Sequence, residues 1–202
     1  MVRIAGPPPA RAPRPLNESL LAGSDLYRIY EPTSREVGRL TFRLVGPRLR
    51  FDHHVDRSKK RGIYYSAPTL EGCVVEVFGD GGMVRFGEYR VANPVLTQDL
   101  LLLDLRRRGA MRAGTVLAIS SADHPLSQAL SRYFYEHPEV YGQIDGLIYP
   151  NAHNGADAVA LYERAAGAID CPPARDWPLS DPIIETAVRE IAHANDLIVD
   201  EP

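Results

Sequence analysis

Two histidine-containing segments are the first candidates for chemistry in this sequence. Asp52-His53-His54 is a continuous run with Asp56 close by, and Asp123-His124 follows later. Asp-His-His clusters can bind two divalent metals that activate water in phosphoesterases. Those enzymes also need Asp-x-Asp pairs, which are absent here, and adjacent histidines on a strand point to opposite faces. These departures favour structural histidines, so no metal is expected. A metal-dependent phosphoesterase built on His53 and His54 is kept as the least favoured of three hypotheses.

Other catalytic motifs are incomplete. Ser120, Ser121, Asp123 and His124 are near neighbours, but a Ser-His-Asp triad is assembled from separate loops and no Gly-x-Ser-x-Gly elbow is present. Neither a Walker loop nor a Gly-x-Gly-x-x-Gly dinucleotide motif occurs. The basic run at residues 106–108 has no interleaved aromatic residues, which favours a solvated loop over a nucleic-acid contact. None of these motifs defines a function.

Length and composition indicate one globular domain. The chain has 202 residues, of which 45% are hydrophobic and 24% charged, with a net charge of -3. A chain of this size buries a self-sufficient core. The near-neutral balance argues against direct nucleic-acid binding, and no apolar run reaches the roughly 18 residues of a membrane span. Cys73 and Cys171 form neither a Cys-x-x-Cys pair nor a disulfide framework, which indicates a cytoplasmic protein.

The N-terminus differs from the rest of the chain. Residues 6–15 are rich in proline and carry only positive charge, and proline lacks a backbone donor and fixes φ. We expect residues 1–18 to form a flexible arm that is extended or disordered rather than packed, ahead of a domain over residues 19–202. The arm and the C-terminal helix could build an interface with a partner or in a homo-oligomer, which the sequence leaves open.

Hydrophobic periodicity predicts the elements that must position any site. Strand patterns occur at residues 26–30, 63–66, 100–105, 115–119, 146–150 and, as the last strand, 158–162. Helical spacing occurs at residues 68–78, 125–137 and about 179–196. Strands and helices mix without a regular βα repeat, which predicts an α+β fold.

Five ordered segments resemble the RES domain, a family named for its Arg, Glu and Ser motif residues. They are Leu26-Tyr27-Arg28-Ile29, Gly46-Pro47-Arg48-Leu49-Arg50-Phe51-Asp52-His53-His54, Arg61-Gly62-Ile63-Tyr64-Tyr65-Ser66-Ala67, Val75-Glu76-Val77-Phe78 and Asp145-Gly146-Leu147-Ile148-Tyr149-Pro150. The resemblance covers about residues 25–162. It implies a single compact domain similar to ADP-ribosyltransferases, with a mixed central sheet flanked by helices.

The resemblance also implies an activity and a partner. RES proteins are typically toxins of bacterial toxin–antitoxin pairs that act on NAD+. Some degrade it by hydrolysis or phosphorolysis, and others transfer ADP-ribose to a protein. The partner is an antitoxin with an Xre-like DNA-binding part, whose end blocks the active cleft. NAD+ would thus be a substrate of this chain, and the acceptor of ADP-ribose stays open.

By motif match, the resemblance assigns site residues. The family arginine falls on Arg28, the glutamate on Glu76, and the aromatic residue before the helix on Tyr65. A second arginine near the dinucleotide is Arg50 or Arg48, although the family's Gly-Arg-Trp segment is not reproduced there. These residues are the expected catalytic and NAD+-binding groups.

Position 151 departs from the family pattern. The family serine follows the Asp-Gly-x-x-Tyr-Pro element, where this chain has Asn151. Asparagine can still hydrogen-bond a ribose or an amide, but it cannot act as a hydroxyl nucleophile or a proton shuttle. The second hypothesis is therefore a RES-like binding module that holds an antitoxin or a nucleotide without turnover.

The residue types suit cleavage of NAD+. Breaking the nicotinamide–ribose bond builds positive charge on the ribose, which the carboxylate of Glu76 would stabilise. Guanidinium groups from Arg28 and Arg50 match the pyrophosphate, and Tyr65 could stack on nicotinamide or present its hydroxyl to the ribose. Because side chains alternate along a strand, this assigns Tyr64 to the core. The helical wheel places Glu76 on a solvated face, so a catalytic Glu76 requires a cleft on that side.

Overall fold

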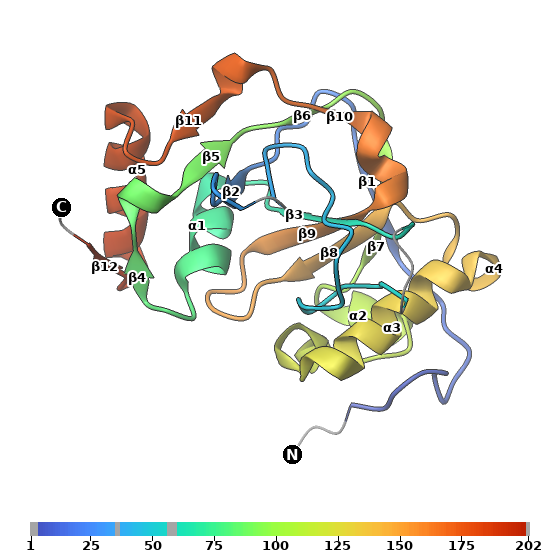
Figure 1. Ribbon diagram of the computed structural model, residues 1–202. Coiled ribbons are helices and arrows are strands. Elements are labelled where there is room, and N and C mark those ends of the chain that lie inside the picture. Colours follow the sequence, from blue (N-terminus) through green and yellow to red (C-terminus); the bar gives the residue numbers. More distant parts are fainter. Residues whose placement is uncertain (1–3, 35–36, 56–59, 201–202) are drawn as a thin grey trace.

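The centre of the fold is a five-stranded mixed sheet with the strand order β1-β7-β8-β9-β3 (Figure 1). The structure, a computed structural model, describes residues 4–34, 37–55 and 60–200. The strands of this sheet are β1 (Asn17–Leu20), β3 (Ile63–Ser66), β7 (Leu100–Asp104), β8 (Gly146–Pro150) and β9 (Asp157–Tyr162). β7 and β8 are parallel, whereas the other neighbours are antiparallel. The predicted α+β class with a mixed sheet is confirmed.

Both faces of this sheet are buried, as the near-continuous apolar strands predict. One face packs against α3 (His124–Glu136) and the short α4 (Pro138–Tyr141). The opposite face is covered in part by a 3-10 helix, Glu163–Ala168. Tyr64 is fully buried on that second face, while Tyr65 contacts the core on the first. The alternation therefore places Tyr64 in the core, as expected.

Helices α1 (Leu70–Phe78) and α5 (Pro182–Ala194) pack against one another at the other end of the molecule (Figure 1). Each begins after a side-chain cap: Thr69 accepts a hydrogen bond from the first turn of α1, and Asp181 does so for α5. These caps set the helix starts slightly later than the periodicity predicts. None of the described helices is long and apolar enough to cross a membrane.

Several short strands lie outside the central sheet. They pair as β2-β5-β11, β6-β10 and β4-β12. Their bounds are β2 (Arg28–Tyr30), β4 (Met83–Val84), β5 (Arg90–Ala92), β6 (Val95–Leu96), β10 (Ile169–Asp170), β11 (Asp176–Pro178) and β12 (Ile198–Val199). The prediction that residues 158–162 form the last strand is wrong, because β10, β11 and β12 follow and are too short for a period-two pattern to show.

The predicted strand at residues 115–119 is also wrong. This segment leads into a 3-10 helix, Leu117–Ser121, after a left-handed Gly114 with φ 88°. β7 is hydrogen-bonded to β1 on one side and to β8 on the other, so it offers this segment no free edge. A short apolar run that finds no strand partner cannot form a sheet.

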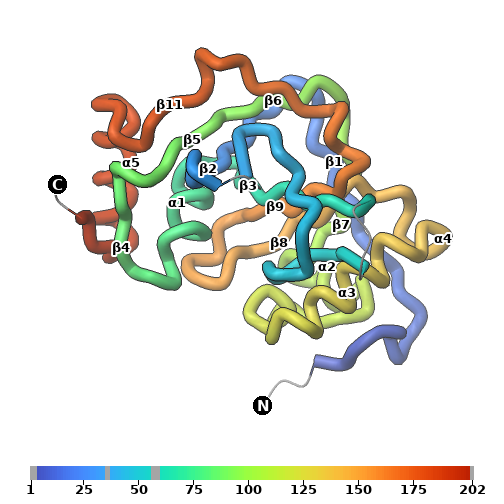
Figure 2. Tube along the Cα trace, in the orientation of Figure 1, coloured from blue at the N-terminus to red at the C-terminus, as the bar shows by residue number. Residues whose placement is uncertain are grey.

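The N-terminal arm lies along the domain beside α2 (Arg108–Arg112) and α3 (Figure 2). Ile4 packs on the core cluster beneath α3. The backbone N–H of Arg14 donates to the carbonyl of Arg112 at 2.8 Å, and the Arg112 side chain donates back to the Arg14 carbonyl at 2.7 Å. The expectation of an unpacked arm is therefore wrong at these residues, and a boundary at residue 18 would fall inside β1.

Candidate active site

A cleft of about 390 Å³ opens between α1, β2, β3 and the segments around residues 50 and 120. It brings together four residues that the sequence pointed to: Arg28, Arg50, Tyr65 and Glu76. They come from β2, a loop, β3 and α1, so the fold gathers groups that lie up to about fifty residues apart in the chain. Arg48 and Asn151 are not among the residues that line it.

Glu76 lies on α1, half-buried, and faces the cleft. Burial raises the pKa of its carboxyl group above the ordinary value. The hydroxyl of Tyr149 opposes this rise by donating to Glu76 Oε1 at 3.2 Å, and the positive charge of Arg50 opposes it as well. The cleft therefore lies on the helix face that the helical wheel marks as solvated. The carboxyl group of Glu76 is half-buried there, where it could interact with a positively charged group.

Arg28 is buried, with 5% of its surface exposed, and no carboxylate of the described residues pairs with it. It donates to the carbonyls of Tyr65 at 3.1 Å and Thr41 at 3.4 Å, and it lies over the Tyr64 ring at 4.2 Å. Its Nε has no partner among the described residues. Burial lowers the pKa of this guanidinium. A buried cation without a counter-ion at a cleft can accept an anionic ligand as its partner.

The two remaining arginines differ in position. Arg50 is half-buried at the cleft, and its guanidinium donates to the carbonyl of Ala122 across the loop. Arg48 is exposed, and its backbone N–H donates to Asp52 at 2.6 Å while its carbonyl contacts His124. Of the two candidates for the second arginine, Arg50 is the one that the cleft includes.

Tyr65 lines the cleft, but its hydroxyl is bound to the neighbouring loop. The hydroxyl donates to Asp52 Oδ1 at 2.9 Å and accepts from the Phe51 backbone N–H at 3.0 Å. Burial raises the pKa of Tyr65 well above its ordinary value. The hydroxyl of Tyr65 therefore ties the loop to β3.

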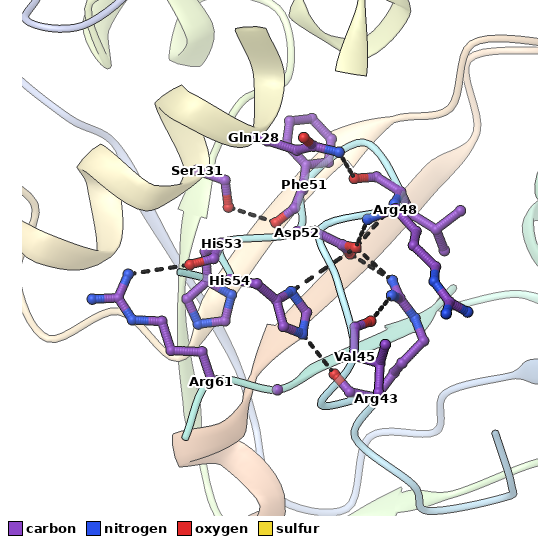
Figure 3. A network of polar contacts seen from close by, with 12 residues as sticks. Arg43, Val45, Arg48, Phe51, Asp52, His53, His54, Arg61, Gln128 and Ser131 are labelled. Atoms are coloured by element: carbon purple, nitrogen blue, oxygen red, sulfur yellow. Dashed lines mark hydrogen bonds and ion pairs between the residues drawn. The ribbon is translucent and has the colours of Figure 1, made fainter. Parts of the chain in front are cut away.

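Asp52 is the centre of the network that shapes this loop (Figure 3). Both its oxygens accept from the buried guanidinium of Arg43 at 2.7 Å, and one accepts the backbone N–H groups of Arg48 and Leu49. Asp52 is fully buried and Arg43 is 6% exposed. A buried ion pair, in which one guanidinium nitrogen donates to both carboxylate oxygens, together with the added backbone donors fixes the loop that carries Arg50.

His53 and His54 do not line the cleft. Nε2 of His53 lies 2.9 Å from Glu163 Oε2, and Nε2 of His54 lies 3.0 Å from the Arg43 carbonyl. Burial lowers the pKa of both imidazoles. Among the described residues no group of three or more His, Cys, Asp or Glu side chains could hold a metal ion, and Asp56 lies outside the described residues. Both histidines act as polar core groups behind the loop.

Asn151 is buried, and its side chain organises the turn after β8 rather than the cleft. Its Oδ1 accepts from the backbone N–H groups of His153, Asn154 and Gly155 at 3.0–3.3 Å, and its Nδ2 donates to Asn154 Oδ1 at 2.9 Å. This turn presents His153 to the cleft. Asn151 thus shapes the wall of the site from behind.

Several residues around the cleft, among them Tyr149, Ser66 and Ser120, were not predicted as site residues from the sequence. Tyr149 holds the Glu76 carboxylate, while Ser66 and Ser120 line the cleft with buried hydroxyls. Tyr149 and Ser66 lie inside two of the five segments that resemble the RES domain. The alternation of side chains along each strand was the signal that could have identified them. In the sequence, Ser120 stood out only as a neighbour of His124 in an incomplete triad, because its place in the cleft depends on how the 3-10 helix meets the loop.

The hydrogen bond from Tyr149 should be visible in the titration of Glu76. Replacing Tyr149 with phenylalanine removes a donor that favours the ionised carboxylate, so we expect the pKa of Glu76 to rise further. NMR titration of the Glu76 carboxyl carbon measures this shift. Tyr141→Phe is the control, because Tyr141 donates to the Ala113 carbonyl instead. An equal shift in both variants would rule out the direct contact.

Comparisons with known proteins give a family and a fold for this chain. A model described as the RES domain matches residues 25–181. A protein named probable toxin y4kH, from Sinorhizobium fredii (strain NBRC 101917 / NGR234), is 35% identical over 85 residues, which are 42% of this chain and 65% of that protein. The matched part therefore spans just under two thirds of this relative.

A solved structure has the same fold. A chain in the crystal structure of the M. tuberculosis MbcT–MbcA toxin–antitoxin complex superposes with a TM-score of 0.57 and 16% identity. The match covers 87% of this chain and 92% of that chain. At this identity the likeness concerns the fold alone.

Proposed function

The chain belongs to the RES domain family, and from this premise we propose that it is a toxin of a bacterial toxin–antitoxin pair that consumes NAD+. A relative that is 35% identical over part of its length is named a probable toxin, and a protein of similar fold comes from a toxin–antitoxin complex. Both similarities support the role as a toxin. The proposed cleavage of NAD+ is supported by the residues of the cleft.

One observation carries the chemical proposal. The buried guanidinium of Arg28, which no described carboxylate neutralises, lines the same cleft as the half-buried carboxylate of Glu76. NAD+ carries a negative pyrophosphate, and its ribose becomes positive as the bond to nicotinamide breaks. Arg28 and Arg50 suit the first charge and Glu76 suits the second. A cleft with both groups fits a dinucleotide that reacts at its ribose.

In the proposed reaction, the bond between ribose C1′ and the nicotinamide nitrogen breaks first. Its electron pair stays with nicotinamide and neutralises the ring, and the ribose takes on oxocarbenium character. The Glu76 carboxylate stabilises that charge or holds the ribose hydroxyls. An oxygen nucleophile then bonds to C1′ and loses its proton. Water, phosphate or a protein group would give ADP-ribose, its phosphorylated form or a modified protein.

The proposed partner is an Xre-type antitoxin that covers this cleft in the cytoplasm. The mouth of the cleft offers the partly exposed apolar side chains of Leu49 and Val77 beside its charged groups. An inhibitory segment could bury these side chains while shielding Arg28 and Glu76 from NAD+.

The first test is a time course of NAD+ loss with the purified full chain. We expect nicotinamide to appear as NAD+ disappears, with EDTA having no effect. Acceleration by phosphate, with a phosphorylated product, would identify phosphate as the acceptor. Chelator-sensitive phosphate-ester hydrolysis would instead support the metal-dependent alternative. Intact NAD+ under all conditions would exclude cleavage of free NAD+.

Arg28 should act mainly on substrate binding. Replacing it with methionine keeps an unbranched apolar stem but removes charge-assisted hydrogen bonds, so we expect the KM for NAD+ to rise about ten- to hundredfold. Steady-state kinetics measures this change. Arg85→Met is the control, because Arg85 is exposed and pairs with Glu88 on the surface. An unchanged KM in Arg28→Met would contradict the proposed pyrophosphate contact.

A specific observation favours a second candidate, a RES-like module that binds without turnover. The side chain of Asn151, which stands at the family's serine position, is occupied by the turn that it organises. A site without that hydroxyl could hold nucleotide or antitoxin and leave NAD+ intact. Binding of ADP-ribose by a protein that leaves NAD+ uncleaved would identify this case.

A further inference from the structure

Ser120 is a buried serine whose hydroxyl has no assigned role. Its side chain lines the cleft, and only 5% of its surface is exposed. Among the described residues its Oγ has no hydrogen-bond partner. An unpaired buried hydroxyl costs free energy, so a native structure usually keeps one only where a ligand or another function uses it.

The cleft contains further groups of this kind. Arg28 Nε and Ser66 Oγ are also buried without a partner among the described residues, and both residues line the same cleft. Three unpaired polar groups from three different elements thus meet at one cavity. A polar ligand that brings its own donors and acceptors would satisfy them together.

The position of Ser120 indicates which part of a dinucleotide it meets. Ser120 is the last residue but one of the 3-10 helix and stands two residues before Ala122, whose carbonyl accepts from the Arg50 guanidinium. Ser120 therefore belongs to the cleft wall beside Arg50, on the side where the pyrophosphate and its adjoining ribose are proposed to bind. Asn151 does not compete for this contact, because its side chain is held in its own turn.

We propose that Ser120 is a substrate-binding residue whose hydroxyl hydrogen-bonds the phosphate or ribose oxygens of the bound dinucleotide. This inference rests on the proposed function and adds a specificity-determining residue to it. A serine hydroxyl can donate and accept, and it turns about a single side-chain bond, so it can meet either oxygen type. Ser120 helps to distinguish ADP-ribose-containing ligands from nicotinamide alone.

The test is calorimetric titration of ADP-ribose, which contains the pyrophosphate and both riboses and cannot lose nicotinamide. The wild-type chain is compared with Ser120→Ala and Ser121→Ala. Ser121 is the matched control, because it is exposed and its hydroxyl donates to the Ala118 carbonyl at 3.2 Å. We expect Ser120→Ala to raise the Kd about two- to tenfold, and Ser121→Ala to leave it unchanged.

Thermal unfolding of the same variants separates binding from folding. Alanine at position 120 removes an unpaired buried polar atom, so the Tm should stay the same or rise while the affinity falls. A lowered Tm in Ser120→Ala, with the affinity loss, would indicate a structural role and overturn the proposal. Wild-type affinity in Ser120→Ala would overturn it and leave the proposed function intact. A wild-type chain that binds neither ADP-ribose nor NAD+ would overturn both.

Discussion

Replacing Glu76 with glutamine is expected to slow NAD+ consumption about 10²–10³-fold, the usual cost of removing one preorganised electrostatic group. Glutamine keeps the size of the side chain and can still accept from Tyr149, but it carries no negative charge. The loss should appear in kcat, because positive charge on the ribose exists only in the transition state. Initial rates of nicotinamide release at saturating NAD+ measure it.

The matched control is Glu71→Gln on the same helix. Glu71 is exposed, and its Oε1 accepts from Asn195 Nδ2 at 3.1 Å, which glutamine can also do. We expect this variant to keep wild-type kcat. Equal activity in Glu76→Gln and wild type would show that the carboxylate takes no part in the reaction, even if NAD+ is consumed.

The pH profile of wild-type kcat should follow the same carboxylate. Because burial raises the pKa of Glu76 in the folded protein, the active ionised form is lost as the pH falls through a value above that of an ordinary glutamate. We therefore expect the acidic limb of kcat to lie at a higher pH than a solvated glutamate would give. The residual kcat of Glu76→Gln should not show this fall at acidic pH, because glutamine carries no titrating carboxyl group.

Replacing Asp52 with alanine should have the largest effect on stability, a loss of about 3–5 kcal/mol in the free energy of unfolding. The substitution leaves the buried Arg43 guanidinium without a counter-ion. It also removes the acceptor of the Tyr65 hydroxyl and of two backbone N–H groups. Urea unfolding followed by circular dichroism measures the change.

A surface ion pair provides the comparison for Asp52. Arg85 and Glu88 are 3.7 Å apart with more than half of each side chain exposed, so Glu88→Gln should change the unfolding free energy by less than about 1 kcal/mol. A loss in Asp52→Ala as small as that of Glu88→Gln would show that the network does not hold the loop. In a folded Asp52→Ala protein we also expect weaker NAD+ binding, because Arg50 lies on that loop.

The sequence by itself determined the local elements and the family. The apolar spacing of residues 70–78 specifies α1, and the alternation at residues 63–66 specifies β3 and places Tyr64 in the core. Both follow from interactions within a few residues, where side-chain periodicity is fixed by backbone geometry. The order of five short motifs likewise indicated the RES domain before any contact between them was known.

Only the tertiary structure decided which faces meet and which polar groups remain unpaired. A helical wheel marks the side of Glu76 as polar but cannot show that Arg50 and Tyr149 come from distant segments to face it. Nor does a sequence pattern show that Asp52 pairs with Arg43, or that β1 takes the edge of β7 and leaves residues 115–119 without a strand partner. These outcomes depend on long-range packing, because burial and hydrogen-bond partners are properties of the whole fold.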